Sequence, residues 1–190
     1  MSDLTSPSRL SVVAPLLEMK GIVKMFPGVQ ALDHVDFTLQ EGEIHAVMGE
    51  NGAGKSTLIK VLTGVYSNDG GSIVLQGQSI QPRSPVEAQK LGITSVYQEV
   101  NLIPYLSVAE NISLGREPVR LGCIDWNEVH RRAEYLLKRL DVEIDVTQPL
   151  NDYSVAIQQM VAIARALGFK SRILVLDEPT SSLDAKEVGE

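Results

Sequence analysis

The sequence predicts an α/β protein with a helical insertion, and three observations lead to that prediction. Short apolar runs typical of strands dominate the first half of the chain, and one of them, Ile44–Met48, enters a glycine-rich turn before a helix. Helical periodicity then extends from about Ser107 to Phe169. The apolar run Ile173–Leu176 finally returns the chain to a strand. This order fits an α/β core that carries a helical subdomain.

Composition limits the classes of protein to consider. The chain has 190 residues, of which 44% are hydrophobic, enough for a proper core. Its net charge of −7 argues against a nucleic-acid partner held through phosphates. A single cysteine, Cys123, excludes an internal disulfide and fits a reducing compartment. With no signal peptide and no apolar run of membrane-spanning length, we expect a cytoplasmic domain.

The individual elements follow from local patterns. Residues 1–15 are rich in Ser and Pro and are expected to form a mobile leader. Strands are expected at Leu16–Lys20, Val35–Leu39, Ile44–Met48, Ser72–Leu75, Gln78–Ile80, Ile93–Tyr97 and Ile173–Leu176. A helix should run from Lys55 to about Thr63.

Two capping boxes predict further helix starts. Ser84 with Pro85 and Glu87 should begin a helix that ends at Lys90, and Ser107 with Glu110 should begin another. The stretch "NEVHRRAEYLLKRL" predicts a helix whose apolar face is formed by Val129, Ala133, Leu136, Leu137 and Leu140. The basic run 130–132 reads as the solvated face of that helix rather than a nucleic-acid contact.

The stretch "GENGAGKST" carries the strongest chemical signal. It matches the pattern G-x-x-x-x-G-K-[ST] and comprises Gly49, Glu50, Asn51, Gly52, Ala53, Gly54, Lys55, Ser56 and Thr57. Its glycines let backbone N–H groups close around an anion, and the following helix directs its positive end there. Lys55 would bind the β- and γ-phosphates, and the Ser56 hydroxyl would be a Mg²⁺ ligand. The competing interpretation is a flexible glycine turn with a surface lysine.

Two carboxylates follow the last apolar strand. Asp177 could hold Mg²⁺, and Glu178 could act as the general base that polarises the attacking water. Alone, the pair could equally supply capping charge to a helix that starts at Pro179. Beside a phosphate loop, the catalytic interpretation is favoured.

These motifs together resemble the ATP-binding domains of ABC transporters, over 16–190. The resemblance implies a P-loop NTPase core of the ABC ATPase type, with an antiparallel β subdomain and a helical subdomain at about 100–170. "VYQEVNLIPYLSVAENI" looks like the Q-loop, which places Gln98 on Mg²⁺ and beside the membrane subunits. "LDEPTSSLD" is similar to the Walker B and D-loop pair. "KMFPGVQALD" is similar to the loop that stacks an aromatic ring on adenine, here Phe26, although such a residue alone is more often part of a core.

Within that family, several sequence segments are similar to those of the ATPases of monosaccharide importers. The segments "GVQALDHVDF", "MGENGAGKSTLIKVLTGVY" and "QQMVAIARAL" carry this likeness, with "GREP" at 115–118 as a subfamily mark. It implies ATP and Mg²⁺ as ligands and a second nucleotide-binding domain, in tandem or as a dimer. It also implies membrane permease subunits, an indirect periplasmic sugar-binding partner and a peripheral position on the inner face of the cell membrane. The sugar is not specified by these motifs.

The chain departs from the family at its signature, L-S-G-G-Q. "YSVAI" at 153–157 takes that place, keeping Ser154 but replacing the second glycine by Ala156 and the glutamine by Ile157. In the family, this helix start binds the γ-phosphate of ATP held by the opposing domain. Ser154 and the backbone N–H of Ala156 suit that anion, while Ile157 removes a polar side chain. This altered signature resembles that of the first domain of galactofuranose-type sugar ATPases. An alternative that is also partly true is a capped helix that packs its apolar face on the core.

The family also requires a histidine about thirty residues after the Walker B glutamate. The histidines of this chain, His34, His45 and His130, all lie upstream. The sequence is therefore expected to be the truncated first domain of a longer polypeptide, inactive alone. Alternatives remain: a nucleotide-binding module without turnover, an importer ATPase for another small solute, or an ABC-type ATPase of DNA repair or translation.

Overall fold

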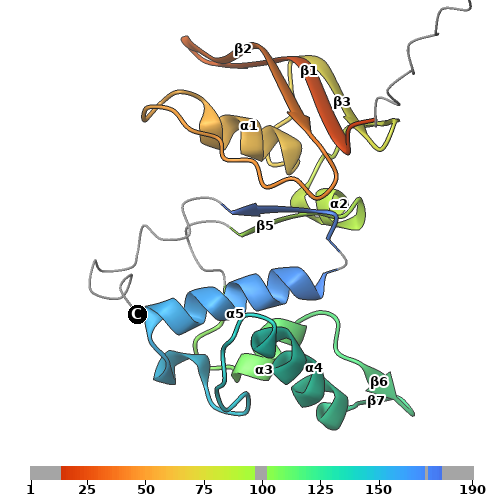
Figure 1. Ribbon diagram of the computed structural model, residues 1–190, viewed down its shortest axis with the longest axis vertical. Helices are drawn as coiled ribbons and strands as arrows, with labels where there is room; N and C mark the ends of the chain where they lie inside the picture. The colour runs from red at the N-terminus through yellow and green to blue at the C-terminus, as the bar shows by residue number, and fades with distance from the viewer. Residues whose placement is uncertain (1–13, 97–101, 170, 177–190) are drawn as a thin grey trace, which may run out of the picture. The chain divides into compact units, whose positions relative to one another are not determined.

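The computed structural model describes residues 14–96, 102–169 and 171–176 (Figure 1). The chain divides into two compact units. Unit 1 comprises residues 1–61 and 66–82, and unit 2 comprises 62–65 and 83–190. Each unit has its own sheet and its own helical element.

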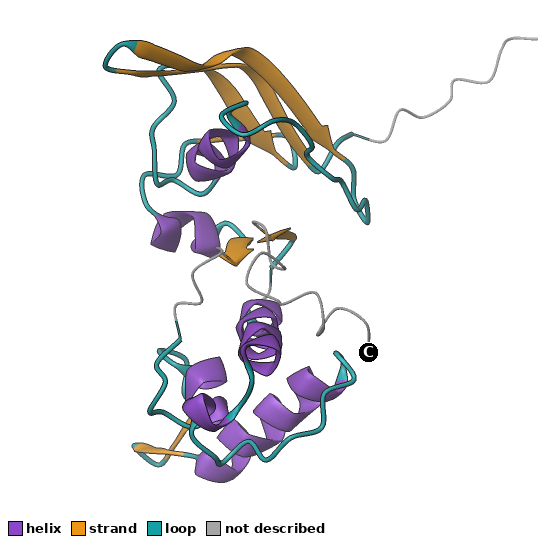
Figure 2. Cartoon of the chain, turned by 90° about the vertical axis from the view of Figure 1, so that its left-hand side faces the viewer, coloured by secondary structure: helices purple, strands orange, loops and turns teal. Residues whose placement is uncertain are grey.

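Unit 1 contains a four-stranded antiparallel sheet with the order β2-β1-β3-β4 (orange arrows in Figure 2). The strands are β1 (Leu17–Phe26), β2 (Val29–Leu39), β3 (Gly70–Leu75) and β4 (Gln78–Ile80). Their inward side chains form the core of the unit: Leu17, Met19, Ile22, Leu32, Ile73 and Leu75 are buried. β3 and β4 confirm the predicted strand pair, whereas β1 and β2 are longer than the apolar runs predicted because a tight turn joins them as a hairpin.

The predicted strand Ile44–Met48 is wrong for this structure. The segment has no regular secondary structure, the Ile44 side chain is fully exposed, and Met48 is 87% exposed. A strand exists only where its N–H and C=O groups find a neighbouring strand. None of the described strands pairs with this segment, so its apolar sequence alone does not make it a strand.

Unit 2 contains two parallel strands, β5 (Ile93–Val96) and β8 (Ile173–Leu176). Their register pairs Ile93 with Ile173 and Val96 with Leu176, so both strands end at the same edge. β8 confirms the strand predicted at Ile173–Leu176. β5 confirms the strand predicted at Ile93–Tyr97 as far as Val96, and residue 97 lies outside the described residues.

Helix α2 (Pro85–Lys90) precedes β5 and confirms the predicted cap only in part. The Ser84 hydroxyl accepts a hydrogen bond from the Glu87 N–H at 3.2 Å. The Glu87 carboxylate, however, accepts from the N–H of Arg83 and not from that of Ser84. The long side chain thus reaches one residue further back than a reciprocal capping box requires.

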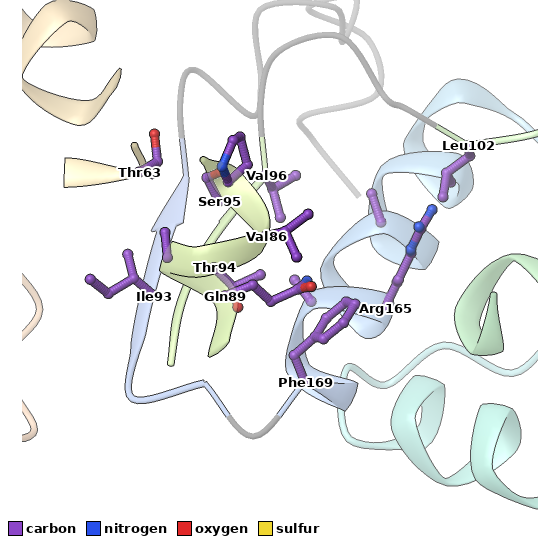
Figure 3. A pocket seen from close by; sticks show the side chains of 14 residues that line it. Thr63, Val86, Gln89, Ile93, Thr94, Ser95, Val96, Leu102, Arg165 and Phe169 are labelled. Carbon is purple, nitrogen blue, oxygen red and sulfur yellow. The ribbon is translucent and has the colours of Figure 1, made fainter. Parts of the chain in front are cut away.

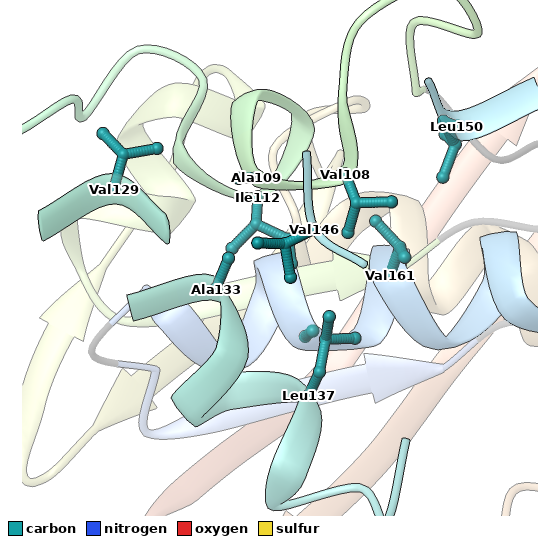
Figure 4. Close-up of a cluster of buried hydrophobic side chains, with 10 residues drawn as sticks. Val108, Ala109, Ile112, Val129, Ala133, Leu137, Val146, Leu150 and Val161 are labelled. Atoms are coloured by element: carbon teal, nitrogen blue, oxygen red, sulfur yellow. The ribbon is translucent and has the colours of Figure 1, made fainter. Parts of the chain in front are cut away.

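The remainder of unit 2 is built on α3 (Val108–Ser113), α4 (Trp126–Lys138), a 3₁₀ turn at Leu150–Asp152 and α5 (Val155–Gly168). The capping box of Ser107 and Glu110 is present in full. Apolar faces of the three helices meet in one core (Figure 4), which comprises Val108, Ala109, Ile112, Val129, Ala133, Leu137, Val146, Leu150, Val161 and Ala164. The predicted apolar face of α4 is confirmed, with Leu136 and Leu140 partly buried against this core.

The continuous helical pattern predicted from 107 to 169 is wrong at two places. Residues 139–149 form no helix, and a small hairpin, β6 (Val119–Arg120) and β7 (Cys123–Ile124), separates α3 from α4. Its two-residue turn has φ +53° at Leu121 and +84° at Gly122. Two successive positive φ values fit the twist of a tight hairpin, and glycine provides the second without strain.

The basic run in α4 is on its solvated face, as predicted. Arg131 and Arg132 both bond the Glu128 carboxylate, each at 2.7 Å. The hydrogen bonds from the two guanidinium groups lower the pKa of Glu128 to about 2, and the bond from Arg131 has the larger effect. None of the helices that the structure describes combines the length and the hydrophobicity of a membrane span.

Asn111 joins α3 to the segment before it. This side chain is fully buried; its Nδ2 donates to the carbonyl oxygens of Ile103, Leu106 and Ser107, and its Oδ1 accepts from the Ile103 N–H. Asn111→Leu keeps the volume but leaves the Ile103 N–H without its acceptor, and it removes one of the two bonds that each of the three carbonyl oxygens accepts. We therefore expect the free energy of unfolding to fall by about 1–3 kcal/mol.

Urea unfolding of the protein measures this change. Asn127→Leu, on the exposed face of α4, is the matched control and should change stability by less than about 0.5 kcal/mol. Equal stabilities for the two variants would contradict the role of the Asn111 amide.

Candidate functional site

The glycine-rich loop connects the irregular segment 44–48 to helix α1 (Lys55–Leu62) in unit 1. Gly52 and Gly54 have φ values of +86° and +89°, which side-chain-bearing residues rarely adopt. A Cβ on Gly54 would lie 2.7 Å from the Ala31 carbonyl oxygen. The loop thus lies so close to β2 that only glycine fits at its last turn, and α1 begins directly after it, as predicted.

Lys55 reaches back across this loop. Its Nζ donates to the Gly49 carbonyl oxygen at 2.7 Å and to that of Glu50 at 2.9 Å. The ammonium group is thereby held at the concave side of the loop, close to the first turn of α1. The N–H groups of a helix's first turn have no partner within the helix, and the helix dipole is positive there. Backbone, dipole and ammonium charge together suit a phosphate group.

The loop is accessible to a ligand. Most of its residues are exposed, including Ser56, while Gly54, Lys55 and Thr57 are half-buried. An exposed hydroxyl on the first turn of α1 is available to a cation held by the same phosphates. The residues 49–57 therefore fit the predicted phosphate-binding loop, although their contacts with a ligand stay predictions.

Phe26 ends β1 and is half-buried, so it is not a core residue. Its ring meets that of Tyr66 edge to face, with 5.2 Å between centroids. The Lys24 ammonium lies 5.6 Å from the Phe26 centroid and bonds Asp69 at 3.1 Å. The Met25 N–H and the Lys24 ammonium hold the pKa of Asp69 below its usual value.

The sequence reasoning missed Tyr66, and local patterns could not have found it. Phe26 and Tyr66 lie on different elements, and only the packing of the segment after α1 brings them together. The resulting group has an aromatic surface beside a cation, a combination that suits a heteroaromatic ring.

Ser154 and Ala156 belong to unit 2, at the N-terminal end of α5. Ser154 is the N-cap residue, and its Oγ accepts a long hydrogen bond of 3.4 Å from the Ile157 N–H. Ser154 is exposed, so its hydroxyl is available to an anion. Gln158, just beyond, donates from Nε2 to the Tyr153 carbonyl oxygen at 3.0 Å.

Ile157 is half-buried near the start of α5. Its side chain packs against the core formed by α3, α4 and α5. The apolar residue therefore stabilises the base of α5, which confirms the interpretation of this segment as a capped helix packing on the core.

Three predicted site residues lie outside the described residues: Gln98, Asp177 and Glu178. The described strands still locate their attachment points. β5 ends two residues before Gln98, and β8 ends directly before Asp177. Because Val96 and Leu176 are partners in the parallel ladder, β5 and β8 end at the same edge of this sheet.

Unit 2 also contains a cavity of about 240 Å³ beside α2, β5 and α5 (Figure 3). Val86, Gln89, Thr94, Arg165 and Phe169 are among the residues that line it. None of the predicted site residues that the structure describes is in this lining. The volume is below the roughly 300–1,000 Å³ of typical small-molecule sites, so we assign it no ligand.

The chain is similar to known proteins over the region that carries these motifs. A family model described as "ABC transporter" matches residues 32–181. The ribose import ATP-binding protein RbsA 1 of Rubrobacter xylanophilus is 55% identical over 174 residues, which cover 92% of this chain and 35% of that protein. The galactofuranose transporter ATP-binding protein YtfR of Escherichia coli is 56% identical over 173 residues, covering 91% and 35%.

Sugars of other kinds occur among the relatives. The fructose import ATP-binding protein FruK of Bifidobacterium longum is 54% identical over 92% of this chain and 34% of its own length. The chain thus spans about a third of the length of these curated relatives.

Solved structures agree on the fold. The ADP conformation of MJ1267, an ATP-binding cassette of an ABC transporter, has a TM-score of 0.76 and 27% identity, covering 90% of this chain and 72% of that one. The dimeric cassette MJ0796 has a TM-score of 0.74 and 30% identity, covering 90% and 77%. The predicted ABC ATPase fold is confirmed by these likenesses.

Proposed function

Because the chain belongs to the ABC transporter family, we propose that it is the ATP-binding part of a monosaccharide importer, binding and hydrolysing MgATP to drive sugar uptake. The observation that carries this proposal is the loop before α1, where Lys55 crosses a glycine turn at a helix start. Relatives that are named as sugar import proteins and are more than half identical support the transport role.

ATP binding uses groups that unit 1 already holds together. The phosphates are received by the backbone of 49–57, and Lys55 exchanges its bonds to Gly49 and Glu50 for bonds to the β- and γ-phosphates. In the new bonds both partners are charged, so these bonds are stronger than those to the neutral carbonyl oxygens that they replace. Phe26, whose ring packs edge to face with Tyr66, would stack on adenine, and base–aromatic stacking contributes about 1–3 kcal/mol.

Hydrolysis requires residues from the strand ends of unit 2. Ser56, Gln98 and Asp177 would hold Mg²⁺, which would neutralise charge that develops on the phosphates. Glu178 takes the proton of the attacking water as general base. Gln98 also lies in the segment that connects the sheet to the helical region, a suitable place for coupling to a membrane partner.

A second nucleotide-binding domain completes the site. Ser154 at the exposed start of α5, with the nearby backbone N–H of Ala156, contacts the γ-phosphate of ATP bound by the opposing domain. We accordingly propose residues 1–15 as a leader and 16–190 as a nucleotide-binding domain with a helical subdomain at about 100–170. It would act at the inner face of the cell membrane with permease subunits and, indirectly, a periplasmic sugar-binding protein.

One competing function is nucleotide binding without turnover, which the altered signature "YSVAI" favours. Ala156 keeps its backbone N–H and Ile157 packs against the core, so the start of α5 retains the backbone donors that an anion needs. We therefore favour turnover.

Reconstitution of the full-length protein with its permease in liposomes tests the function. We expect ATP hydrolysis that rises several-fold when a sugar-loaded binding protein is present, together with uptake of a labelled monosaccharide from a panel of ribose, galactose, xylose, galactofuranose and fructose. ATP binding without any turnover would support the module that only binds nucleotide. Turnover that no sugar or permease changes would contradict the transport role.

A further inference from the structure

Phe26 lies at the tip of the hairpin formed by β1 and β2, where the sheet of unit 1 supports it least. It pairs with Val29 across the turn. The neighbouring strand β3 pairs with β1 only as far as Val23, which lies opposite Gly70. The last three residues of β1 are therefore paired with one strand instead of two. A two-stranded ribbon is marginally stable by itself, so other groups must fix this tip.

The segment that follows α1 supplies such groups, beginning with Asp69. Its N–H donates to the Val23 carbonyl oxygen at 2.8 Å. Its carboxylate accepts from the Met25 N–H at 2.7 Å and from the Lys24 ammonium at 3.1 Å. One residue thus bonds three successive residues of β1, and it holds the backbone of the hairpin as far as Met25.

Tyr66, in the same segment, extends this support to the ring of Phe26. The two rings meet edge to face, with 5.2 Å between centroids and 75° between planes. Tyr66 is itself held on α1: its N–H donates to the Lys60 carbonyl oxygen at 3.0 Å, and the Lys60 ammonium lies 5.7 Å from its ring centroid. Because an edge-to-face contact depends on the angle between the rings, Tyr66 restricts the tilt of Phe26.

Helix α1 connects this aromatic pair to the phosphate loop. Lys55, its first residue, crosses the loop, and Lys60, which holds Tyr66, follows about 7–8 Å further along the helix axis. The hairpin also contacts the start of α1, where the backbone of Gly54 approaches β2 so closely that a Cβ would not fit. Contacts at both ends of α1 therefore tie the ring of Phe26 to the phosphate loop.

We propose that Tyr66 is a positioning residue of the adenine subsite. It holds the ring of Phe26 at one angle and so preforms the stacking surface for the base of a nucleotide whose phosphates lie on residues 49–57. This inference rests on the proposed function. Without the Tyr66 ring, the hairpin keeps its backbone bonds to Asp69, but the Phe26 ring gains rotational freedom that it must lose again when the base binds. The effect should therefore concern the base and not the phosphates.

Tyr66→Leu in the full-length protein tests the proposal with ligands that have and lack a base. Calorimetric titration should show MgATP binding weakened by about three- to tenfold, the factor that an aromatic pair contributes. Binding of magnesium tripolyphosphate, which has no base, should change by less than about twofold. Tyr66→Phe keeps the ring and should restore the parent affinity. Tyr135→Leu, at an exposed tyrosine of α4, is the matched control and should bind both ligands as the parent does.

A double-mutant cycle with Phe26→Leu separates positioning from a general effect on folding. Phe26→Leu should weaken MgATP binding by about five- to a hundredfold. Adding Tyr66→Leu should cause no further loss, because the ring that Tyr66 orients is then absent. In steady-state hydrolysis, Tyr66→Leu should raise the KM for ATP and leave kcat within about twofold, since the base is bound equally in the ground state and the transition state.

Equal MgATP affinities for Tyr66→Leu and the parent would overturn the proposal, and so would a loss that tripolyphosphate shares. Additive losses in the double variant would overturn it too, because Tyr66 would then act independently of Phe26. Parent affinity in Phe26→Leu would have the same consequence, since the Phe26 ring would have no part in binding. All of these outcomes leave ATP binding itself intact. A parent protein that does not bind MgATP would refute the proposed function, and the inference with it.

Discussion

Lys55→Ala should reduce the affinity for MgATP by about a hundredfold or more. In the structure the ammonium is already held across the loop by two carbonyl oxygens, at 2.7 and 2.9 Å, so little further ordering is needed to meet a phosphate. Charge-assisted hydrogen bonds contribute about 1.5–3 kcal/mol each, and every 1.4 kcal/mol corresponds to about a tenfold change in affinity. Losing contacts to both the β- and γ-phosphates therefore removes at least two factors of ten.

Calorimetric titration of the variant with MgATP measures this loss. Lys138→Ala, which removes an exposed lysine from the last turn of α4, controls for the change in net charge and should bind as the parent does. Unfolding curves check that the loop change has not destabilised unit 1. If Lys55→Ala and the parent bind MgATP equally, the phosphate-loop assignment is wrong.

Glu178→Gln should abolish most turnover while leaving nucleotide binding intact. The amide has the shape of the carboxylate but cannot accept the proton of the attacking water, and general-base catalysis contributes about 10²- to 10⁴-fold. We expect kcat at this site to fall by that factor and the affinity for MgATP to change by less than about twofold. Single-turnover hydrolysis separates the chemical step from nucleotide exchange.

Glu134→Gln, at an exposed position of α4, is the control for loss of a carboxylate and should hydrolyse ATP at the parent rate. Unchanged single-turnover hydrolysis by Glu178→Gln would show that another group is the base. Glu178→Gln should still bind MgATP, whereas Lys55→Ala should lose binding itself. The two variants therefore distinguish a defect in the chemical step from a defect in binding.

The local structural motifs of the chain could be predicted from its sequence. The hydrogen bonds of a helix start and of a tight glycine loop close within a few residues, so Ser107 with Glu110 and the loop before Lys55 specify their own geometry. The apolar face of α4 was predicted for the same reason, since its period is set by the helix.

The tertiary structure decided whatever depends on a distant partner. Ile44–Met48 has the composition of a strand but no neighbour among the described strands, and a ladder needs two chains. Tyr66 becomes the ring partner of Phe26 only through packing, and Ile157 packs against the core because α5 turns that face toward it. Gln159 is the clearest case. In the sequence it is one of two adjacent glutamines, and its burial distinguishes it from Gln158, because an unpaired amide is costly only where water is excluded.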